Sequence, residues 1–235
     1  MIQKKNNFDF YLKSGQPISK IFLDQLAQIN HQYTKKKNFS QYEKQILNLF
    51  QLKPYNKKTK SMFFYLAGFL EGEASLNLGA KKNKTSTFKV FFDPEFNITQ
   101  HANGIQNLYL ALHVFQTGRI RYKSGSLATF VYTIDNRQAL KEKVVPFYET
   151  YVTYGSKTKK NRVKLFKHVL LLFEEKAHLN YNRMVNEFIP LWAALRIQHN
   201  SNQTFKNEKE AKRFIQKAYE QQKFKLKSSE TITSS

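Results

Sequence analysis

The stretch that most constrains this chain lies at residues 66–74 and reads Leu-Ala-Gly-Phe-Leu-Glu-Gly-Glu-Ala. Apolar residues between Lys60 and Leu70 recur every three to four positions, which predicts a helix with one apolar face. Gly68 and Gly72 lie beside that face, although a glycine inside a helix costs about 0.5–1 kcal/mol relative to alanine. Their spacing predicts that another backbone comes close there, and we expect it to be a second copy of the same helix.

Two acidic residues, Glu71 and Glu73, stand at the end of this predicted helix. The helix dipole places negative charge at that end, so carboxylates are unfavourable there unless a positive charge is nearby. If two such helices cross about a symmetry axis, the two copies of Glu73 approach each other, and a bound cation would offset their repulsion. Carboxylate oxygens suit hard divalent metals. The stretch therefore predicts a dimer contact and a metal site in one place.

These residues resemble the nine-residue signature of the LAGLIDADG homing endonucleases. Leu66, Ala67 and Gly68 match its opening, and Glu71 and Glu73 stand at its two acidic positions. The resemblance is strongest from about residue 63 to 134 and is closest to the single-motif enzymes encoded in organellar large-subunit rRNA introns. The chain departs from the consensus in three places: glutamate replaces both aspartates, and Ala74 replaces the last glycine.

The resemblance implies an α+β fold, with an αββαββα core built on an antiparallel, saddle-shaped sheet and with helical N- and C-terminal extensions. It also implies a homodimer that cuts double-stranded DNA with Mg²⁺ at a long, pseudo-palindromic target in an intronless rRNA gene. Glu73 is then the catalytic carboxylate and holds the metal together with Ala74. The implied dimer interface consists of Phe64, Ala67, Gly68, Glu71 and Gly72. Two interpretations stay open for Glu71, because this residue could instead serve the junction at the end of the helix.

Composition points independently to a polyanionic partner. The formal charge of +22 comes from 39 basic and 17 acidic residues, which is far more than solubility needs. We expect nucleic acid rather than a membrane, because no apolar run approaches the roughly 20 residues that span a bilayer and no secretory signal opens the chain. The absence of cysteine excludes disulfides, a thiolate nucleophile and Cys-ligated zinc. The 32 lysines against 7 arginines suggest an AT-rich genome, such as that of a chloroplast or mitochondrion.

Residues 1–58 are predicted to form an N-terminal helical extension. Ser19 precedes one helix, Ser40 and Glu43 form a capping-box pattern for a second, and Pro54 lies in the link to the core. The extension could brace the fold or place Lys35–Lys37 on flanking DNA, and we expect bracing.

Residues 59–160 are predicted to form the core. Alternating apolar residues indicate two hairpins, the first with strands at 74–78 and 88–100 and the second turning at Gly125. A helix at 105–115, closed by Gly118, separates the hairpins, and a helix interrupted by Pro146 spans 138–151. Such two-stranded ribbons fit the major groove of DNA.

The DNA surface is predicted from the polar side of these strands. Arginine can pair with guanine and asparagine with adenine. The candidate DNA-binding residues are Asn77, Lys89, Asn97, Arg119, Arg121 and Lys123, each of which could instead touch only phosphate or solvent.

Further catalytic candidates also come from the resemblance. The segment Ile98-Thr99-Gln100 is similar to the family segment whose glutamine contacts the attacking water, although Gln100 could be a polar strand end. A basic residue is expected near the scissile phosphate, and a predicted basic loop at 155–160 contains Lys157, Lys159 and Lys160. Lys159 and Lys160 are the catalytic candidates. The alternative is that they are ordinary lysines exposed to solvent.

The rest of the chain is predicted to be helical. Residues 161–224 form C-terminal helices packed on the core, the last of them capped by Asn207 and Glu210, and residues 225–235 form a disordered tail. The chain carries one copy of the acidic signature, which predicts a homodimer with an isologous contact. Two rivals keep the fold: a maturase that assists splicing of intron RNA, and a DNA-binding protein without catalysis. The intact acidic pair favours the nuclease.

Overall fold

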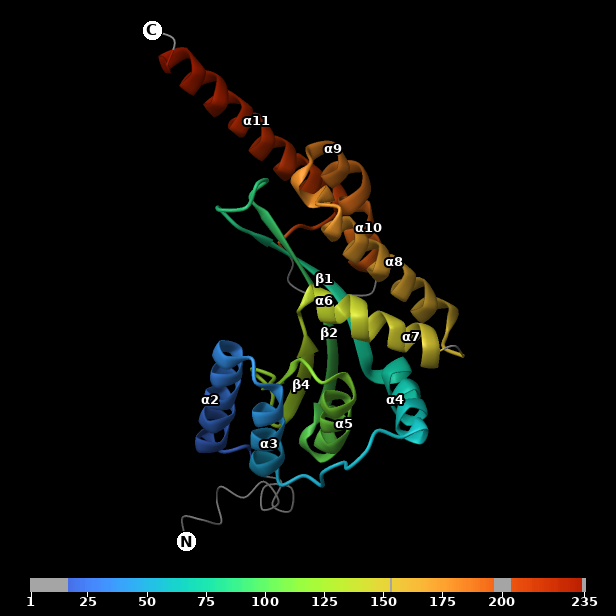
Figure 1. The fold of residues 1–235 in the computed structure, drawn as a ribbon. Coiled ribbons are helices and arrows are strands. Elements are labelled where there is room, and N and C mark those ends of the chain that lie inside the picture. The colour runs from blue at the N-terminus through green and yellow to red at the C-terminus, as the bar shows by residue number, and fades with distance from the viewer. Residues whose placement is uncertain (1–16, 153, 197–203, 234–235) are drawn as a thin grey trace. The chain divides into compact units, whose positions relative to one another are not determined.

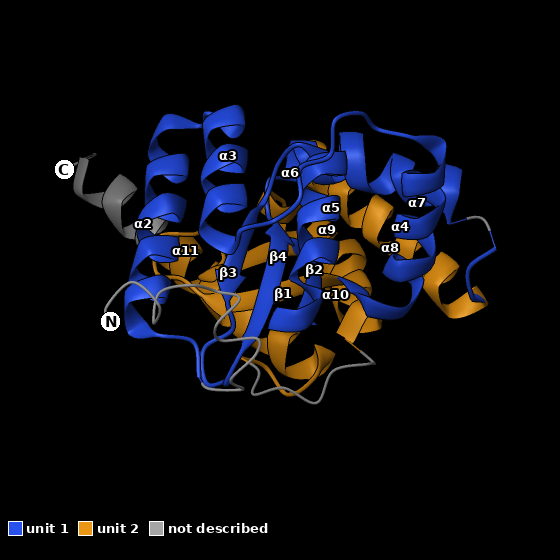
Figure 2. Ribbon diagram, turned by 90° about the horizontal axis from the view of Figure 1, so that it is seen from below, with its two compact units in different colours: residues 1–75, 95–156 blue, residues 76–94, 157–235 orange. Residues whose placement is uncertain are grey.

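The computed structural model describes residues 17–152, 154–196 and 204–233 (Figure 1). Its contacts divide the chain into two compact units (Figure 2). Unit 1 comprises residues 1–75 and 95–156, and unit 2 comprises residues 76–94 and 157–235. The four consecutive segments predicted from the sequence differ from this division, because the outer part of the first hairpin clusters with the C-terminal helices.

Unit 1 begins with two helices that lie side by side, α2 (Lys20–Lys36) and α3 (Phe39–Phe50) (Figure 1). Ser19 caps α2 as predicted, since its hydroxyl accepts a bond from the N–H of Phe22. The capping box predicted at Ser40 is wrong: Asn38 caps α3, and its side-chain oxygen accepts from the N–H of Gln41 at 3.1 Å. Lys37 ends α2 in the left-handed conformation, so Asn38 is already extended and in position to start the next helix.

Four antiparallel strands form one sheet in the order β1-β2-β4-β3. Their bounds are Ala74–Lys82 for β1, Val90–His101 for β2, Arg119–Tyr122 for β3 and Thr129–Ile134 for β4. Within unit 1, β2 pairs with β4 from Phe96↔Ile134 to His101↔Thr129, and β3 pairs with β4 from Arg119↔Thr133 to Tyr122↔Phe130. The α+β class and the two hairpins predicted from alternation are confirmed.

Side chains of the N-terminal helices cover the open edge of β3. The N–H of Ile120 donates to Tyr42 Oη at 2.9 Å, and Asn30 Nδ2 donates to the carbonyl of Ile120 at 2.9 Å. The Tyr42 hydroxyl donates in turn to Asn30 Oδ1 at 3.0 Å. Unpaired strand edges invite association with other strands, so these bonds protect the sheet. Burial raises the pKa of Tyr42 well above its usual value, which keeps its hydroxyl protonated. These contacts support a bracing role for the extension.

The remaining helices of unit 1 are α4 (Lys60–Glu73), α5 (Ile105–Phe115) and the series α6 (Arg137–Ala139), η3 (Leu140–Val144) and α7 (Val145–Tyr151). The series contains the interruption predicted at Pro146. The η3 turn is π-helical and precedes Pro146, which lacks an N–H and disturbs the preceding turn of a regular helix. Phe96, Phe115 and Phe147 pack edge to face with one another or with neighbouring rings in the core.

Unit 2 is built around the outer part of the first hairpin. Its helices are α8 (Lys157–Glu174), η4 (Ala177–Leu179), α9 (Tyr181–Arg183), η5 (Met184–Phe188), α10 (Ile189–Arg196) and α11 (Glu208–Thr233). Phe92 of β2 packs against Phe188 and Trp192, with ring centroids 4.8 and 6.2 Å away. The C-terminal helices are therefore held by the hairpin rather than by each other alone. None of the helices in the described part of the chain is both long and apolar enough to cross a bilayer.

Helix α11 starts with the predicted cap and ends later than predicted. Asn207 Oδ1 accepts from the N–H of Glu210 at 2.9 Å, while Glu210 accepts from the N–H of Lys206 at 2.6 Å. The helix continues to Thr233, where the sequence predicted a disordered tail from residue 225. Residues 224–233 contain neither glycine nor proline, so no residue in this stretch breaks the helix.

Gly118 serves the turn into β3 rather than the end of α5. Gln116 ends α5 in the left-handed conformation, and its N–H donates to the carbonyl of Leu112 at 2.9 Å. Gly118 itself has φ of +79°, and a Cβ added there would lie 2.6 Å from the carbonyl oxygen of Thr133. The predicted cap is corrected accordingly: only glycine fits this close approach of two backbones.

Gly118→Ala is expected to destabilise the protein more than Gly125→Ala. Both glycines have φ near +80°, at which an alanine costs about 1–2 kcal/mol, but a Cβ at Gly125 would meet no atom within 4 Å. The difference between the two variants in free energy of unfolding, measured by urea denaturation, isolates the clash of the added Cβ with Tyr132, Thr133 and Ile134. Equal losses for the two variants would contradict it.

Candidate functional site

Helix α4 carries the acidic stretch. Thr59 caps the helix by accepting from the N–H of Met62, and Leu66, Ala67 and Leu70 form its buried face. Glu73 is the last helical residue and is exposed, and Ala74 starts β1 in an extended conformation. The helix therefore delivers the carboxylate of Glu73 and the main chain of Ala74 to adjacent positions at its end.

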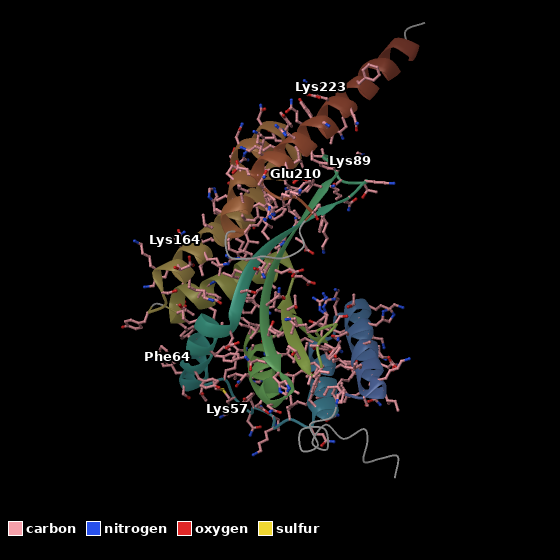
Figure 3. All side chains as sticks on the ribbon, turned by 180° about the vertical axis from the view of Figure 1, so that it is seen from behind. Lys57, Phe64, Lys89, Lys164, Glu210 and Lys223 are labelled. Atoms are coloured by element: carbon pink, nitrogen blue, oxygen red, sulfur yellow. The ribbon has the colours of Figure 1, made fainter. Side chains whose placement is uncertain are left out.

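The opposite face of α4 is open. Gly68 and Gly72 are exposed, and an added Cβ at either would meet nothing within 4 Å. Phe64, one turn before Gly68, is 56% exposed and projects from the helix (Figure 3). Nothing within the described residues of the subunit requires these glycines, so the face remains free for a partner. Ala67, also predicted to lie at the interface, points into the subunit and is buried.

Glu71 connects α4 to the segment that follows α7. Its Oε1 accepts from the N–H of Ser156 at 2.8 Å, and a side chain on Gly155 would lie 2.6 Å from its Oε2. Glu71 Oε2 and the Tyr148 hydroxyl are buried and have no hydrogen-bond partner among the described residues. Burial, and next the negative charge of Glu71, raise the pKa of Tyr148. The contact with Ser156 favours the junction role that the sequence left open for Glu71.

Arg162, which sequence reasoning missed, fixes the start of β1. Its Nε donates to the carbonyl of Leu76 at 2.7 Å and its Nη2 donates to Asn77 Oδ1 at 3.1 Å. The side chain is buried, and burial lowers the pKa of its guanidinium. A signal existed in the sequence, because Arg162 falls on the same helical stripe as the buried residues Phe166, Val169 and Phe173 of α8.

Gln100 lies near the end of β2, paired with Phe130, and is half-buried. Its side chain turns toward the start of α5, where a Cβ on Gly104 would lie 2.4 Å from Gln100 Oε1. Glycine at position 104 therefore leaves room for the glutamine side chain. The arrangement fixes the direction of Gln100, whose catalytic role stays a prediction.

The basic loop predicted at 155–160 is mostly helical. Helix α8 begins at Lys157, so only Gly155 and Ser156 of that stretch remain outside it. Lys157 and Lys160 are exposed and Lys159 is half-buried, all within the first turn of α8. The bond from Ser156 to Glu71 holds the backbone just before the helix, which explains why the loop is short.

The residues of the cationic face predicted on β3 lie in unit 1, and their contact with DNA stays a prediction. The register places Asn97, Thr133 and Arg119 in one cross-strand row and Thr99, Val131 and Arg121 in the next. Arg121 and Lys123 are exposed. The guanidinium of Arg119 instead bonds to Asp135 and, at 3.0 Å, to Thr34 of α2. Asn97 donates to Glu95 at 3.0 Å.

The two predicted DNA-binding residues of unit 2 have contacts inside the subunit. Asn77 accepts from Arg162, as described above. Lys89, near the tip of the first hairpin, has a φ of 59° and donates through Nζ to the carbonyl of Lys84 at 2.8 Å (Figure 3). Both residues therefore help to shape the hairpin.

The donor set near Glu73 fits a hard divalent cation that also binds phosphate. The described residues contain no group of three or more His, Asp or Glu side chains arranged to hold a metal. One subunit thus offers the Glu73 carboxylate and the Ala74 carbonyl, both oxygen donors. Mg²⁺ binds in this way, through one or two carboxylates with the remaining positions left to water and substrate phosphates.

Comparison with known proteins identifies the family. The family model described as LAGLIDADG endonuclease matches residues 66–170. The DNA endonuclease I-CeuI of Chlamydomonas moewusii is 50% identical over 208 residues, which cover 88% of this chain and 95% of that protein.

Solved structures agree with this match. The group I intron-encoded homing endonuclease I-CeuI complexed with DNA superposes with a TM-score of 0.82 at 48% identity, covering 86% of this chain and 98% of that one. The archaeal intron-encoded homing endonuclease I-Vdi141I, also complexed with DNA, shares the fold with a TM-score of 0.61 at 24% identity, covering 68% of this chain and 98% of that one. This chain belongs to the LAGLIDADG endonuclease family.

Proposed function

We propose that this chain is a site-specific, intron-encoded endonuclease that cleaves double-stranded DNA as a homodimer with Mg²⁺. The observation that carries the proposal is the 50% identity to a DNA endonuclease over nearly the whole chain. The net charge of +22 and the exposed Glu73 at the end of α4 support it. The target is a long, pseudo-palindromic site in an intronless rRNA gene, and the gene lies in an organellar genome.

Nucleases of this family generally depend on divalent metal, which activates water and neutralises charge on the phosphate when bound. In this chain the Glu73 carboxylate and the Ala74 carbonyl hold the cation. Glu71, just before that pair, accepts a hydrogen bond from the N–H of Ser156. Leu76, just after it, accepts one from Arg162 through its carbonyl. Gln100 orients the attacking water, and a lysine of the first turn of α8, Lys159 or Lys160, lies near the phosphate.

Two copies of α4 form the dimer contact through Phe64, Gly68 and Gly72. This face is open to a partner. Phe64 is exposed, and a Cβ added at Gly68 or Gly72 would meet no atom of the described subunit within 4 Å. Ala67 supports this face from inside the subunit, and Glu71 fixes the end of its helix. Dimer symmetry brings two Glu73 side chains to the two strands of one target, so both strands are cut.

Glu73→Gln is expected to lower the rate of DNA cleavage by at least about a thousandfold, because losing a ligand of the catalytic metal removes several kcal/mol of transition-state stabilisation. Cleavage of an intronless rRNA-gene duplex in Mg²⁺ measures the rate, and gel-shift binding in Ca²⁺ is expected to stay tight. Glu142→Gln, an exposed control on η3 with the same change in net charge, should cut like the wild type.

Normal cutting by Glu73→Gln would remove Glu73 from the metal site. A wild-type protein that binds intron RNA and never nicks DNA would establish the maturase alternative. Specific DNA binding without cleavage under any divalent cation would instead establish a non-catalytic DNA-binding protein.

Gly68→Ala is expected to weaken the dimer while leaving the fold of the subunit intact. The added methyl has open space in the subunit and favours helix by about 0.5–1 kcal/mol, but it overfills a close helix crossing. Sedimentation equilibrium should show a dimer dissociation constant raised about tenfold or more. Gly79→Ala, where the nearest atom to the new Cβ would be 3.6 Å away, is the matched control. An unchanged dimer constant in Gly68→Ala would place the interface elsewhere.

Target affinity is expected to fall about a thousandfold between 50 and 200 mM salt if about six phosphates are neutralised. Arg121→Ala should reduce the slope of log K against log salt by about one for each phosphate that Arg121 neutralises, since Arg121 is exposed on the cationic face. Lys44→Ala, an exposed lysine of α3, serves as the control. Equal slopes for the wild type and Arg121→Ala would exclude a phosphate contact by Arg121.

A further inference from the structure

Leu127 is an unexplained apolar side chain on the second hairpin. It lies in the turn between β3 and β4 and is 76% exposed, more than any other aliphatic side chain among the exposed large hydrophobic residues of the described chain. Single exposed apolar residues are common on proteins, so exposure alone carries no function. The surroundings of Leu127 add two further observations.

The first observation is that hydrogen bonds within the hairpin hold the turn. Ser126 Oγ donates to the carbonyl of Lys123 at 2.7 Å and accepts from the N–H of Thr129 at 3.1 Å. The Tyr122 hydroxyl donates to the carbonyl of Ser126. On the other side of Leu127, the Ala128 carbonyl accepts from the N–H of Ala102 at 2.8 Å. The carbonyls of both neighbours of Leu127 therefore accept hydrogen bonds, and the leucine lies between these two contacts.

The second observation is the position of Leu127 in the hairpin. Ala128 extends the ladder between β2 and β4, and its side chain is buried. Leu127 immediately precedes Ala128 in this turn and, unlike Ala128, has an exposed side chain. Thr129 pairs with His101, and its carbonyl accepts from the N–H of Lys123 at 2.8 Å. Leu127 thus lies in the short turn that joins Lys123 to Thr129, next to the strand that carries Arg121.

We infer that Leu127 is a specificity-determining residue that contacts the 5-methyl group of a thymine in the major groove of the target. This inference rests on the proposed function, because it assigns a base contact to a hairpin that faces DNA. The thymine methyl is the apolar group that the major groove offers, and an aliphatic side chain is its natural partner. The flanking cations bind phosphate and fix the position of the turn, while Leu127 distinguishes thymine from cytosine and from uracil.

The experiment replaces single thymines of a cleavable rRNA-gene duplex by deoxyuridine, which removes the methyl and keeps base pairing. Affinity is measured by gel shift in Ca²⁺, position by position. Burial of one methyl is worth about fourfold in affinity, so the wild type should lose about fourfold at a contact in one half-site and about fifteenfold when both half-sites are changed. Leu127→Ala should bind the thymine and deoxyuridine duplexes equally at that position.

Two further variants make the result specific. Leu127→Met keeps an apolar contact and should retain most of the thymine preference. Leu179→Ala removes another exposed leucine, on η4 of unit 2, and should behave like the wild type. Circular dichroism checks folding, which should be unchanged because the Leu127 side chain is largely exposed.

Several outcomes would overturn the inference. One is that deoxyuridine leaves the affinity of the wild type unchanged at every position. Another is that Leu127→Ala keeps the full preference for thymine over deoxyuridine. A Leu127→Ala variant that weakens binding to both duplexes equally, as a minor-groove wedge would, also excludes the methyl contact. A wild type that neither binds nor cuts the duplex specifically would instead refute the proposed function, so the two failures are distinguishable.

Discussion

The hydrogen bond from the N–H of Ser156 to Glu71 is the constraint on which the arrangement around Glu73 depends. Carboxylates at the C-terminal end of a helix are unfavourable by about 0.3–1 kcal/mol each, and contacts that hold this end offset that cost. Glu71 holds the side before Glu73, and Arg162 holds the backbone of β1 three residues after it. Glu73 itself stays exposed. The chain on both sides of Glu73 is held by hydrogen bonds while its carboxylate stays exposed. This arrangement suits a residue that must bind a cation and a phosphate.

Much of the fold could be predicted because its elements depend on short-range sequence patterns. The helix at 105–115, the alternating strands and the caps at Ser19 and Asn207 all depend on residues within a few positions of each other. Where two local signals compete, sequence reasoning chose wrongly. Ser40 and Asn38 both can cap α3, and the left-handed conformation of Lys37 decides for Asn38. Gly118 and Gln116 could both end α5. Gln116 does so, because Gly118 is needed in the next turn, where its backbone has a positive φ and lies close to Thr133.

The candidate site could be predicted only in part. The acidic stretch and its open glycine face follow from local spacing, but the residues that support them come from far along the chain. Ser156 is 85 residues from Glu71, and Arg162 is 86 residues from Leu76. A single sequence shows that Arg162 falls on an apolar stripe, yet it does not show which carbonyl accepts from it. For the same reason the sequence places Arg119 on a cationic strand but does not show that its guanidinium bonds to Asp135 and Thr34.

The outer part of the first hairpin and the second hairpin lie in different units, which affects how such a protein could change its recognition. The outer part of the first hairpin rests on aromatic residues of the C-terminal helices, whereas β3 is secured by Tyr42 and Asn30. Substitutions in the outer first hairpin are therefore accommodated by the C-terminal helices, and substitutions on β3 by the N-terminal helices. A substitution in the outer first hairpin and one on β3 therefore meet different supporting residues, although β2 and β4 pair with each other in the sheet.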